Sequence, residues 1–282
     1  MPLLLTTCAD YPDGTDDDRH LVEALRGRGA RPEVRRWDAI EPQADCTVLM
    51  RSPWDYFQRA AEFSAWLDAL EAAGARVLNP LPVLRWNMDK AYLRELAAAG
   101  LALPATRWLD APTPTTVRAA MAEAGWTRAV LKPRVSGGAW GTHLLDADTD
   151  LTDDMLAPAQ ASGAVLQEFL PEIQGAGELS VIFLGGRYSH AVRKTAAPGD
   201  FRVQSDFGGA VAPAEPKPET LVLAARAHGA TPASCLYARV DIVETERGPL
   251  LMELEVLEPE LFFRVARPSA GRLAEAVLAA MA

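Results

Sequence analysis

The first 86 residues alternate between short apolar runs and amphipathic stretches, a pattern typical of an α/β domain. We expect strands at 3–7, 33–37, 47–51 and 76–78, and helices at 16–28 and 60–73. Gly29 and Gly74 follow the two helices, in the position where glycine commonly ends a helix. The first strand–helix turn, TTCADYPDG, contains no GxGxxG, so the domain is Rossmann-like without the usual dinucleotide phosphate site.

The middle of the chain is expected to form a helix, a linker, a second helix and three strands. Residues 91–99 are strongly helical, Gly100 suits the helix end, and Pro104 prevents continuation. The segment APTPTT (111–116) is typical of a linker and leads to a helix at 117–124. Strands are predicted for AVLKPRV, THLLDA and AVLQEFL, with the glycine-rich turn GGAWG between the first two.

The segment LSVIFLGGRYSHAV predicts a β-hairpin, because two adjacent glycines suit a two-residue turn between strands. An uninterrupted register sets Glu178 opposite Arg193 and places Lys194 in line with Val181 and His190. Helices are expected at 218–228 and 269–281, and YARVDIV and LLMELEV are expected to be paired strands.

The run LLMELEVLEPELFF (250–263) is as apolar as a buried strand, yet it carries four glutamates. Alternation puts Arg239 and Asp241 on one face of the first paired strand, and Glu253 and Glu255 on one face of the second. The opposite face carries core residues, Met252, Leu254 and Val256. The connecting segment is too long to fix the register. A half-exposed sheet face and a site where carboxylates meet magnesium both remain open.

Other charged residues suggest phosphate or substrate contacts. The turn SGGAWGT can fold over a triphosphate while Lys132 behind it supplies positive charge, although an ordinary hairpin explains it too. Lys90 opens a helix, a position that a bound phosphate would favour and that a solvated lysine also occupies. Glu258 and Glu260 flank Pro259, which interrupts strand pairing, so we expect solvent or substrate contacts there. RSPWDYF (51–57) suits a substrate pocket or simple packing.

Composition excludes several classes of protein. The 282 residues are 49% hydrophobic, which predicts about two domains with ample core, and the net charge of -10 argues against a nucleic-acid binder. The 3 cysteines and 4 histidines are scattered, so a structural zinc site is not expected. Without a signal peptide or an apolar membrane-length run, we expect a soluble cytoplasmic protein with no membrane partner.

Taken in order, these elements resemble the ATP-grasp ligases. NMDKAYLRELAAAGLALPATRWL looks like their lysine-bearing helix, and AVLKPRVSGGAWGT looks like their second ATP lysine and mobile glycine loop. VLQEFL resembles the strand that borders adenine, and GELSVIF resembles the strand that places a ribose-contacting acid. YARVDIV and LLMELEV resemble the arginine–metal aspartate strand and the metal glutamate strand. The resemblance covers roughly residues 87–260.

The resemblance implies roles for individual residues. The ATP phosphates would be bound by Lys90 and Lys132, under a lid that includes Ser136, Gly137, Gly138 and Gly141. Adenine would be held by Gln167, Glu168, Phe169 and Leu170, and ribose by Glu178 or, as a second candidate, Glu172. Magnesium would be bound by Asp241, Glu253 and Glu255. Arg239 would stabilise the transferring phosphate or tetrahedral intermediate, with Lys194 and Arg202 near the reacting groups.

The resemblance also implies a fold and an activity. The fold would have an N-terminal α/β domain (1–86) and two ATP-clasping subdomains (87–170 and 171–282). The activity would be ATP-dependent carboxylate–amine ligation through an acyl phosphate, with ATP and Mg2+ as cofactors, a small carboxylate or amino-acid substrate, and a homodimer left open. Glu255 stands where the family usually has asparagine. This feature, with RSPWDYF and DFRVQSDFGG, is similar to the subgroup that closes O-ureidoserine to cycloserine. An intermolecular dipeptide or glutathione-type ligase and a non-catalytic nucleotide-binding regulator are the alternatives.

Overall fold

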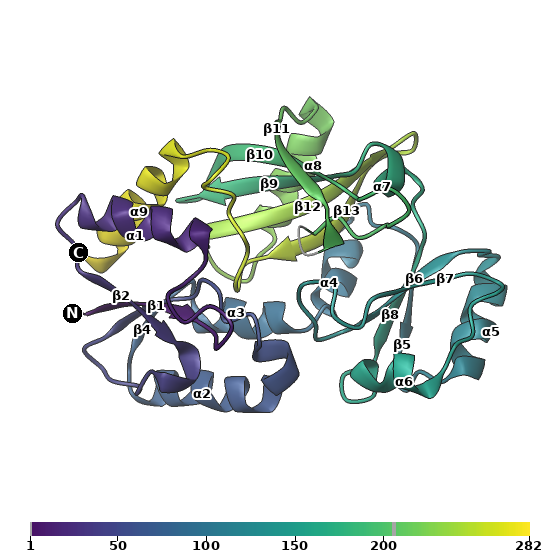
Figure 1. Cartoon of the computed structure of the whole chain (residues 1–282), viewed down its shortest axis with the longest axis horizontal. Coiled ribbons are helices and arrows are strands. Elements are labelled where there is room, and N and C mark those ends of the chain that lie inside the picture. The colour runs from purple at the N-terminus through teal and green to yellow at the C-terminus, as the bar shows by residue number, and fades with distance from the viewer. Residues whose placement is uncertain (1, 205–206) are drawn as a thin grey trace.

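Three β-sheets organise the chain, at the lower left, top and right of Figure 1. The computed structural model describes residues 2–204 and 207–282. The sheets lie within residues 3–78, 106–168 and 178–255, which is compatible with the domain division proposed at residues 86 and 170. None of the described helices is long and apolar enough to cross a membrane.

The first sheet is the expected parallel α/β unit. Its order is β2-β1-β3-β4, with β1 (Leu3–Thr7), β2 (Pro32–Arg36), β3 (Thr47–Leu49) and β4 (Arg76–Leu78). The helices are α1 (Asp16–Arg26) and α2 (Ala60–Ala72), with short 3-10 turns at Trp37–Ala39 and Tyr56–Arg59. Leu5 packs in the cluster that contains α1, whereas Leu4 packs in the cluster that contains α2. Strand β1 is therefore buried on both faces, as its unbroken apolar run predicts.

The second sheet is antiparallel, with one apolar and one polar-bearing face. Its order is β5-β8-β6-β7, with β5 (Thr106–Leu109), β6 (Ala129–Pro133), β7 (His143–Leu145) and β8 (Ala164–Glu168). The helical segments are α5 (Pro114–Ala124), α6 (Asp153–Leu156) and a 3-10 turn at Ala157–Ala159. Leu131 and Leu166 pack against Val117 of α5, so Lys132 and Gln167 lie on the other face.

Two elements that follow the first sheet were not predicted from the sequence, one helix and the first strand of the second sheet. The connection contains α3 (Leu81–Met88) before the expected α4 (Tyr92–Ala98), and β5 follows α4. Helix α3 starts with proline in its first turn, and Val83 packs with Tyr92 of α4. Its short sequence, LPVLRWNM, is mostly apolar and carries a weak helical pattern, so this packing decides its conformation.

The third sheet is antiparallel and links the other two parts of the molecule. Its order is β11-β10-β9-β12-β13, with β9 (Glu178–Leu184), β10 (Arg187–Thr195), β11 (Ala210–Ala214), β12 (Tyr237–Thr245) and β13 (Gly248–Glu255). The helices are α7 (Glu172–Gly175), α8 (Pro218–Gly229) and α9 (Pro268–Met281). Figure 1 shows α9 beside α1, and both share one apolar cluster with β9. The C-terminal helix thus covers the first domain as well as the third sheet.

Two expectations about strand register were wrong. A bulge between Tyr188 and His190 shifts the β9–β10 register, so Glu178 pairs with Lys194, and Arg193 pairs with Leu179. The connection between β12 and β13 is a two-residue turn, because the strands extend beyond their sequence motifs to pair Thr245 with Gly248. Both strand pairs therefore have a defined register that brings charged side chains together.

Candidate active site

Charged side chains gather on one half of a single face of the third sheet. Ile182, Leu184 and Val192 pack on that face in the cluster that contains α9. Farther along the same strands, Ser180, Glu178 and Lys194 continue the face, because side chains two residues apart point the same way. The sheet therefore changes from an apolar core to a polar site along its strands.

Asp241 is the buried centre of this polar half, with 3% of its surface exposed. Its carboxylate accepts hydrogen bonds from Arg239 Nε at 3.0 Å, Lys194 Nζ at 3.1 Å and Ser180 Oγ at 2.5 Å. Burial opposes its ionisation, but Arg239 and Lys194 outweigh burial and hold the pKa of Asp241 below its ordinary range. Asp241 is therefore an ionised carboxylate held in place by two cations.

The β9–β10 bulge brings Lys194 into this network. Lys194 is 5% exposed, and its Nζ lies 2.5 Å from Glu178 and 3.1 Å from Asp241. In the uninterrupted register expected from the sequence, Arg193 would have stood opposite Glu178 instead. A bulge inserts one extra residue in one strand, and it reverses which residues share a face. Nothing in the local sequence distinguishes this bulged hairpin from a regular one.

The glutamates of β13 lie opposite the charged residues of β12, because a bulge between Asp241 and Ile242 shifts the register, which the sequence had left open. Asp241 pairs with Glu253 and Arg239 pairs with Glu255 across the strands. Glu253 forms an ion pair with Lys90 at 2.8 Å, and the Glu255 carboxylate contacts the Arg239 guanidinium. Burial raises the pKa of Glu255, and the neighbouring carboxylates add to this against the effect of Arg239. Leu254 and Val256 are fully buried together in the core cluster on the opposite face. The expectation that Met252 shares their face was wrong, because the bulge falls at Met252, which packs instead in the cluster that contains Val243.

These carboxylates supply the oxygen ligands that magnesium prefers, but they do not converge on one point. Among the described residues, no group of three His, Cys, Asp or Glu side chains is arranged to hold a metal ion. Each carboxylate instead contacts a cation: Asp241 and Glu255 contact Arg239, and Glu253 contacts Lys90. The donor chemistry fits magnesium. Binding at all three carboxylates would require these ion pairs to open.

Lysines are concentrated at this site. The sequence contains four lysines, at positions 90, 132, 194 and 217, and only Lys217 is well exposed. Lys90 Nζ donates to the Ser136 carbonyl at 3.0 Å, in addition to its ion pair with Glu253. Lys132 Nζ donates to Gln167 Oε1 at 3.0 Å, and burial lowers the pKa of Lys132. Both lysines thus lie close to the carboxylates, and their role in binding phosphate stays a prediction.

The glycine-rich loop at residues 136–141 rests on the first domain. Trp140 lies against Phe57, with ring centroids 5.4 Å apart, and a Cβ on Gly137 would approach the Phe57 ring to 2.9 Å. Gly138 and Gly141 have positive φ angles of 57° and 66°. A Cβ on Gly141 would also meet Pro133 at 2.8 Å. Glycine is therefore required for the loop's close approach at Gly137 and Gly141.

The residues expected around adenine and ribose have different environments. Gln167 Nε2 donates to Thr106 Oγ1, Glu168 forms an ion pair with Arg247, and the Arg128 guanidinium lies over the Phe169 ring. Leu170 packs in an apolar cluster that also contains Met252. Glu178 pairs with Lys194, whereas Glu172 Oε2 is buried without a hydrogen-bond partner among the described residues.

Arg202 is not part of the carboxylate network. Its guanidinium bonds with Asp200 at 2.8 Å and lies 3.7 Å from the Phe207 ring centroid. Two residues of the segment DFRVQSDFGG, Ser205 and Asp206, lie outside the described residues. The role expected for Arg202 remains a proposal.

Sequence reasoning gave no role to the contacts that place the first domain beside Glu258. Arg51 Nη2 donates to the Pro259 carbonyl at 3.1 Å, and Trp54 Nε1 donates to the Glu258 carbonyl at 3.0 Å. The buried Tyr56 side chain lies close to the Glu258 carboxylate. The aromatic and polar character of RSPWDYF was the available signal, and it left a substrate pocket and simple packing equally open.

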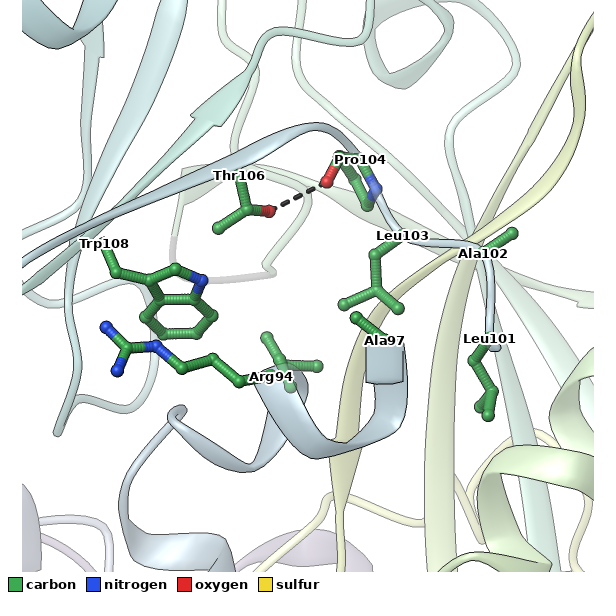
Figure 2. Close-up of a pocket in the computed structure, with 9 residues that line it drawn as sticks. Arg94, Ala97, Leu101, Ala102, Leu103, Pro104, Thr106 and Trp108 are labelled. Atoms are coloured by element: carbon green, nitrogen blue, oxygen red, sulfur yellow. Dashed lines mark hydrogen bonds between the residues drawn. The ribbon is translucent and has the colours of Figure 1, made fainter. Parts of the chain in front are cut away.

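A separate pocket of about 400 Å³ opens between α4 and β5 (Figure 2). Its wall includes Arg94 beneath the Trp108 ring, with the guanidinium 4.5 Å from the ring centroid. Thr106 donates to the Pro104 carbonyl in the same wall and connects through Gln167 to Lys132. The pocket is therefore next to the lysine-bearing face of the second sheet, while the carboxylates lie elsewhere.

Two segments of the chain match known family models. Residues 3–79 match the family model for the N-terminal domain of D-cycloserine synthetase DcsG, and residues 130–261 match the model for RimK-like ATP-grasp domains. The cycloserine biosynthesis protein DcsG of Streptomyces lavendulae is 30% identical over 283 residues, covering 91% of each chain. A probable alpha-L-glutamate ligase of Parasynechococcus marenigrum (strain WH8102) is 32% identical over 188 residues, covering 65% of this chain and only 39% of that protein.

Solved structures agree with these matches. The crystal structure of D-cycloserine synthetase DcsG covers 100% of both chains with a TM-score of 0.87 and 26% identity. The D-alanine–D-alanine ligase from Bacillus anthracis covers 99% of this chain and 96% of its own, with a TM-score of 0.67 and 16% identity, which shows a shared fold. Similarity to DcsG along nearly the whole chain shows that this protein belongs to the ATP-grasp family of ATP-dependent ligases.

Proposed function

We propose that this protein uses ATP to activate a substrate carboxylate as an acyl phosphate and then closes a ring by attack of a nitrogen within the same molecule. The substrate we propose is O-ureidoserine, and the product is cycloserine. The observation that carries this choice is the match of residues 3–79 to the DcsG N-terminal domain, together with 30% identity to DcsG along 91% of the chain. The first domain contributes Arg51, Trp54 and Tyr56 beside the charged site, which supports a role for it in substrate choice.

In the first step, a carboxylate oxygen of the substrate attacks the γ-phosphorus of ATP, and ADP leaves. Lys90 and Lys132 would hold the phosphates, and Arg239 would orient the attacking carboxylate and balance the developing charge. Magnesium, held by Asp241, Glu253 and Glu255, would neutralise phosphate charge when bound. In the second step, a substrate nitrogen attacks the carbonyl carbon and phosphate leaves. For O-ureidoserine, water then hydrolyses the bond between the ring nitrogen and the carbamoyl group, which is released as carbon dioxide and ammonia.

The deciding experiment measures ADP release with O-ureidoserine and with a panel of amino acids, singly and in pairs. We expect ADP release with O-ureidoserine alone, and cycloserine in the products by mass spectrometry. ADP release only with pairs of amino acids would replace cyclisation by intermolecular ligation. ATP consumption without any added carboxylate would contradict both ligase activities. A cytoplasmic location and a homodimer remain proposals that fractionation and light scattering can test.

A further inference from the structure

Two charged residues of the site stand apart from its ion pairs, one on the second sheet and one beside the first domain. Lys90 pairs with Glu253, Lys194 pairs with Glu178 and Asp241, and Arg239 pairs with Asp241 and Glu255. Among the described residues, neither Lys132 nor Glu258 has an ion pair. Lys132 is bonded to Gln167 of the second sheet, whereas Glu258 lies beside Tyr56 of the first domain. The site is therefore suited to a ligand with a negative part near Lys132 and a positive part near Glu258.

The position of Glu258 is built by three parts of the chain. Trp54 donates to the Glu258 carbonyl and Arg51 donates to the next carbonyl, that of Pro259, so the backbone that follows the Glu258 side chain is anchored. The glycine-rich loop comes close, since a Cβ on Gly137 would stand 3.9 Å from Glu258 Oε1. The Glu258 carboxylate also interacts electrostatically with Arg239, Glu253 and Lys90. Its side chain is only partly buried, so it can reach a ligand.

We infer that Glu258 binds the α-ammonium group of an amino-acid substrate and so selects amino acids over other carboxylic acids. This inference rests on the proposed function, because it requires a substrate whose carboxylate is activated at the same site. In an α-amino acid the ammonium group is attached one carbon from the carboxylate. A substrate carboxylate at Arg239 therefore places its ammonium group near that arginine, where Glu258 is the carboxylate without an ionic partner. A charge-assisted hydrogen bond between them is specific for the cation.

The position of Glu258 also links recognition to closure of the glycine-rich loop. Phe57, one residue after Tyr56, packs against Trp140 and Gly137 of the loop. A substrate bound at Glu258 thus contacts the first domain next to the surface on which the loop rests. Glu260, in contrast, is compensated by an ion pair with Arg264. Glu258 and Glu260, which flank Pro259, therefore differ in their ionic partners although their sequence contexts are alike.

The test compares O-ureidoserine with 3-(ureidooxy)propionate, which is the same molecule without the amino group. Glu258→Gln should raise the KM for O-ureidoserine by about 10- to 100-fold, the range expected for loss of a charge-assisted hydrogen bond. Its KM for ATP should change much less than its KM for O-ureidoserine, since ATP has no ammonium group for Glu258 to bind. With 3-(ureidooxy)propionate, wild type and variant should have the same KM. The matched control Glu260→Gln should keep the wild-type preference for the amino compound.

Glu258→Asp provides a second variant, because it retains the charge with a shorter reach and should recover part of the preference. A thermal melt of each variant establishes that it is folded. An unchanged KM in Glu258→Gln, or an equal loss on both compounds, would overturn the inference while leaving the proposed function intact. If wild-type protein releases ADP with another amino acid instead, the same comparison applies to that amino acid and its des-amino analogue. No ADP release with any amino acid would overturn the proposed function, and this inference with it.

Discussion

At the scale of single residues, lysines and arginines occupy different environments in this protein. Lys and Arg together number 28, and only four are lysines. Three of these lysines lie at the charged site, whereas arginines such as Arg35 and Arg59 form exposed ion pairs. The ammonium group is a compact point charge on a flexible stem, which suits phosphate oxygens that move during a reaction. Arg239 instead uses its planar fork to bind Asp241 through two nitrogens.

Replacement of Lys132 by alanine should weaken ATP binding. Lys132 has no ionic partner among the described residues, so its charge is available to a phosphate, and its loss should raise the dissociation constant about 10- to 100-fold. Isothermal titration calorimetry with a non-hydrolysable ATP analogue measures this directly. Lys217→Ala is the control, since this exposed lysine lies 3.9 Å from Glu244 and away from the site. Equal affinity in both variants would remove Lys132 from the nucleotide site.

Replacement of Glu253 by glutamine should destabilise the protein in the absence of nucleotide. From the sequence alone, removal of one of several clustered carboxylates would be expected to relieve repulsion and preserve stability. The ion pair at 2.8 Å with the buried Lys90 reverses this expectation. Loss of the pair leaves Lys90 uncompensated, which should lower the free energy of unfolding by about 1–3 kcal/mol.

The effect of Glu253→Gln should depend on pH. Burial opposes ionisation of Glu253, but Lys90 and Lys132 outweigh burial, so the pKa of Glu253 is lowered in the folded protein. A lowered carboxyl pKa stabilises the fold above the ordinary value of 4.5, and this contribution is lost as the pH falls below it. Urea unfolding at pH 7.5 and at pH 4 should therefore show a smaller difference between wild type and variant at the lower pH. A variant as stable as the wild type at pH 7.5 would contradict the ion pair.

At the scale of elements, the glycine-rich loop links the second sheet to the first domain. Its chemistry suits motion, because Gly138 is exposed and glycine places few restrictions on the backbone. Its contacts suit closure, because Trp140 and Gly137 meet Phe57. We therefore expect two sources of order for the loop, the aromatic contact and a bound nucleotide.

Hydrogen exchange can separate these two sources. We expect backbone amides at 137–142 to exchange more slowly when ATP and magnesium are added, because phosphates supply new partners for the loop. Phe57→Ala should raise exchange in the nucleotide-free protein by removing the surface beneath Trp140. Peptides covering β8 should be unaffected and provide an internal reference. Equal exchange with and without nucleotide would mean that the loop is an ordinary surface turn.

At the scale of the whole molecule, one buried side chain connects the first domain to the third sheet. Asn79 is 1% exposed, and its amide nitrogen donates to the Tyr237 carbonyl at 2.9 Å and the Val256 carbonyl at 2.8 Å. Its amide oxygen accepts from Leu236 N at 2.5 Å. The Tyr237 hydroxyl in turn donates to the Met50 carbonyl at 2.8 Å. These buried polar groups have hydrogen-bond partners only when the first domain is docked on the third sheet.

Asn79→Ala should therefore destabilise the protein by about 2–4 kcal/mol, since it leaves several buried backbone groups without partners. Chemical unfolding followed by circular dichroism and by tryptophan fluorescence measures the loss. Gln43→Ala, at an exposed position of the same domain, should remain within about 0.5 kcal/mol of the wild type. Wild-type stability in Asn79→Ala would show that the docking of the two parts depends on other contacts.

Much of this molecule is determined by the sequence itself. Strand β1 at 3–7, the helices around 16–26 and 60–72, and the Gly185–Gly186 turn follow from apolar periodicity and glycine placement, which act over a few neighbouring residues. The same local alternation placed Arg239 with Asp241, and Glu253 with Glu255. The order of lysine, glycine-loop and carboxylate motifs was sufficient to indicate an ATP-grasp ligase.

Only the tertiary structure decided how these charges meet. The bulge in β10 turned Lys194 toward Glu178, and a bulge between Asp241 and Ile242 in the β12–β13 pair set Asp241 opposite Glu253. The ion pair of Glu253 with Lys90 joins residues 163 positions apart, and the contacts of Glu258 come from a segment about 200 residues earlier in the chain. Such pairings depend on register and domain docking, which are set by the burial of distant apolar surfaces. Local pattern therefore identified the charged residues, and long-range packing determined their partners.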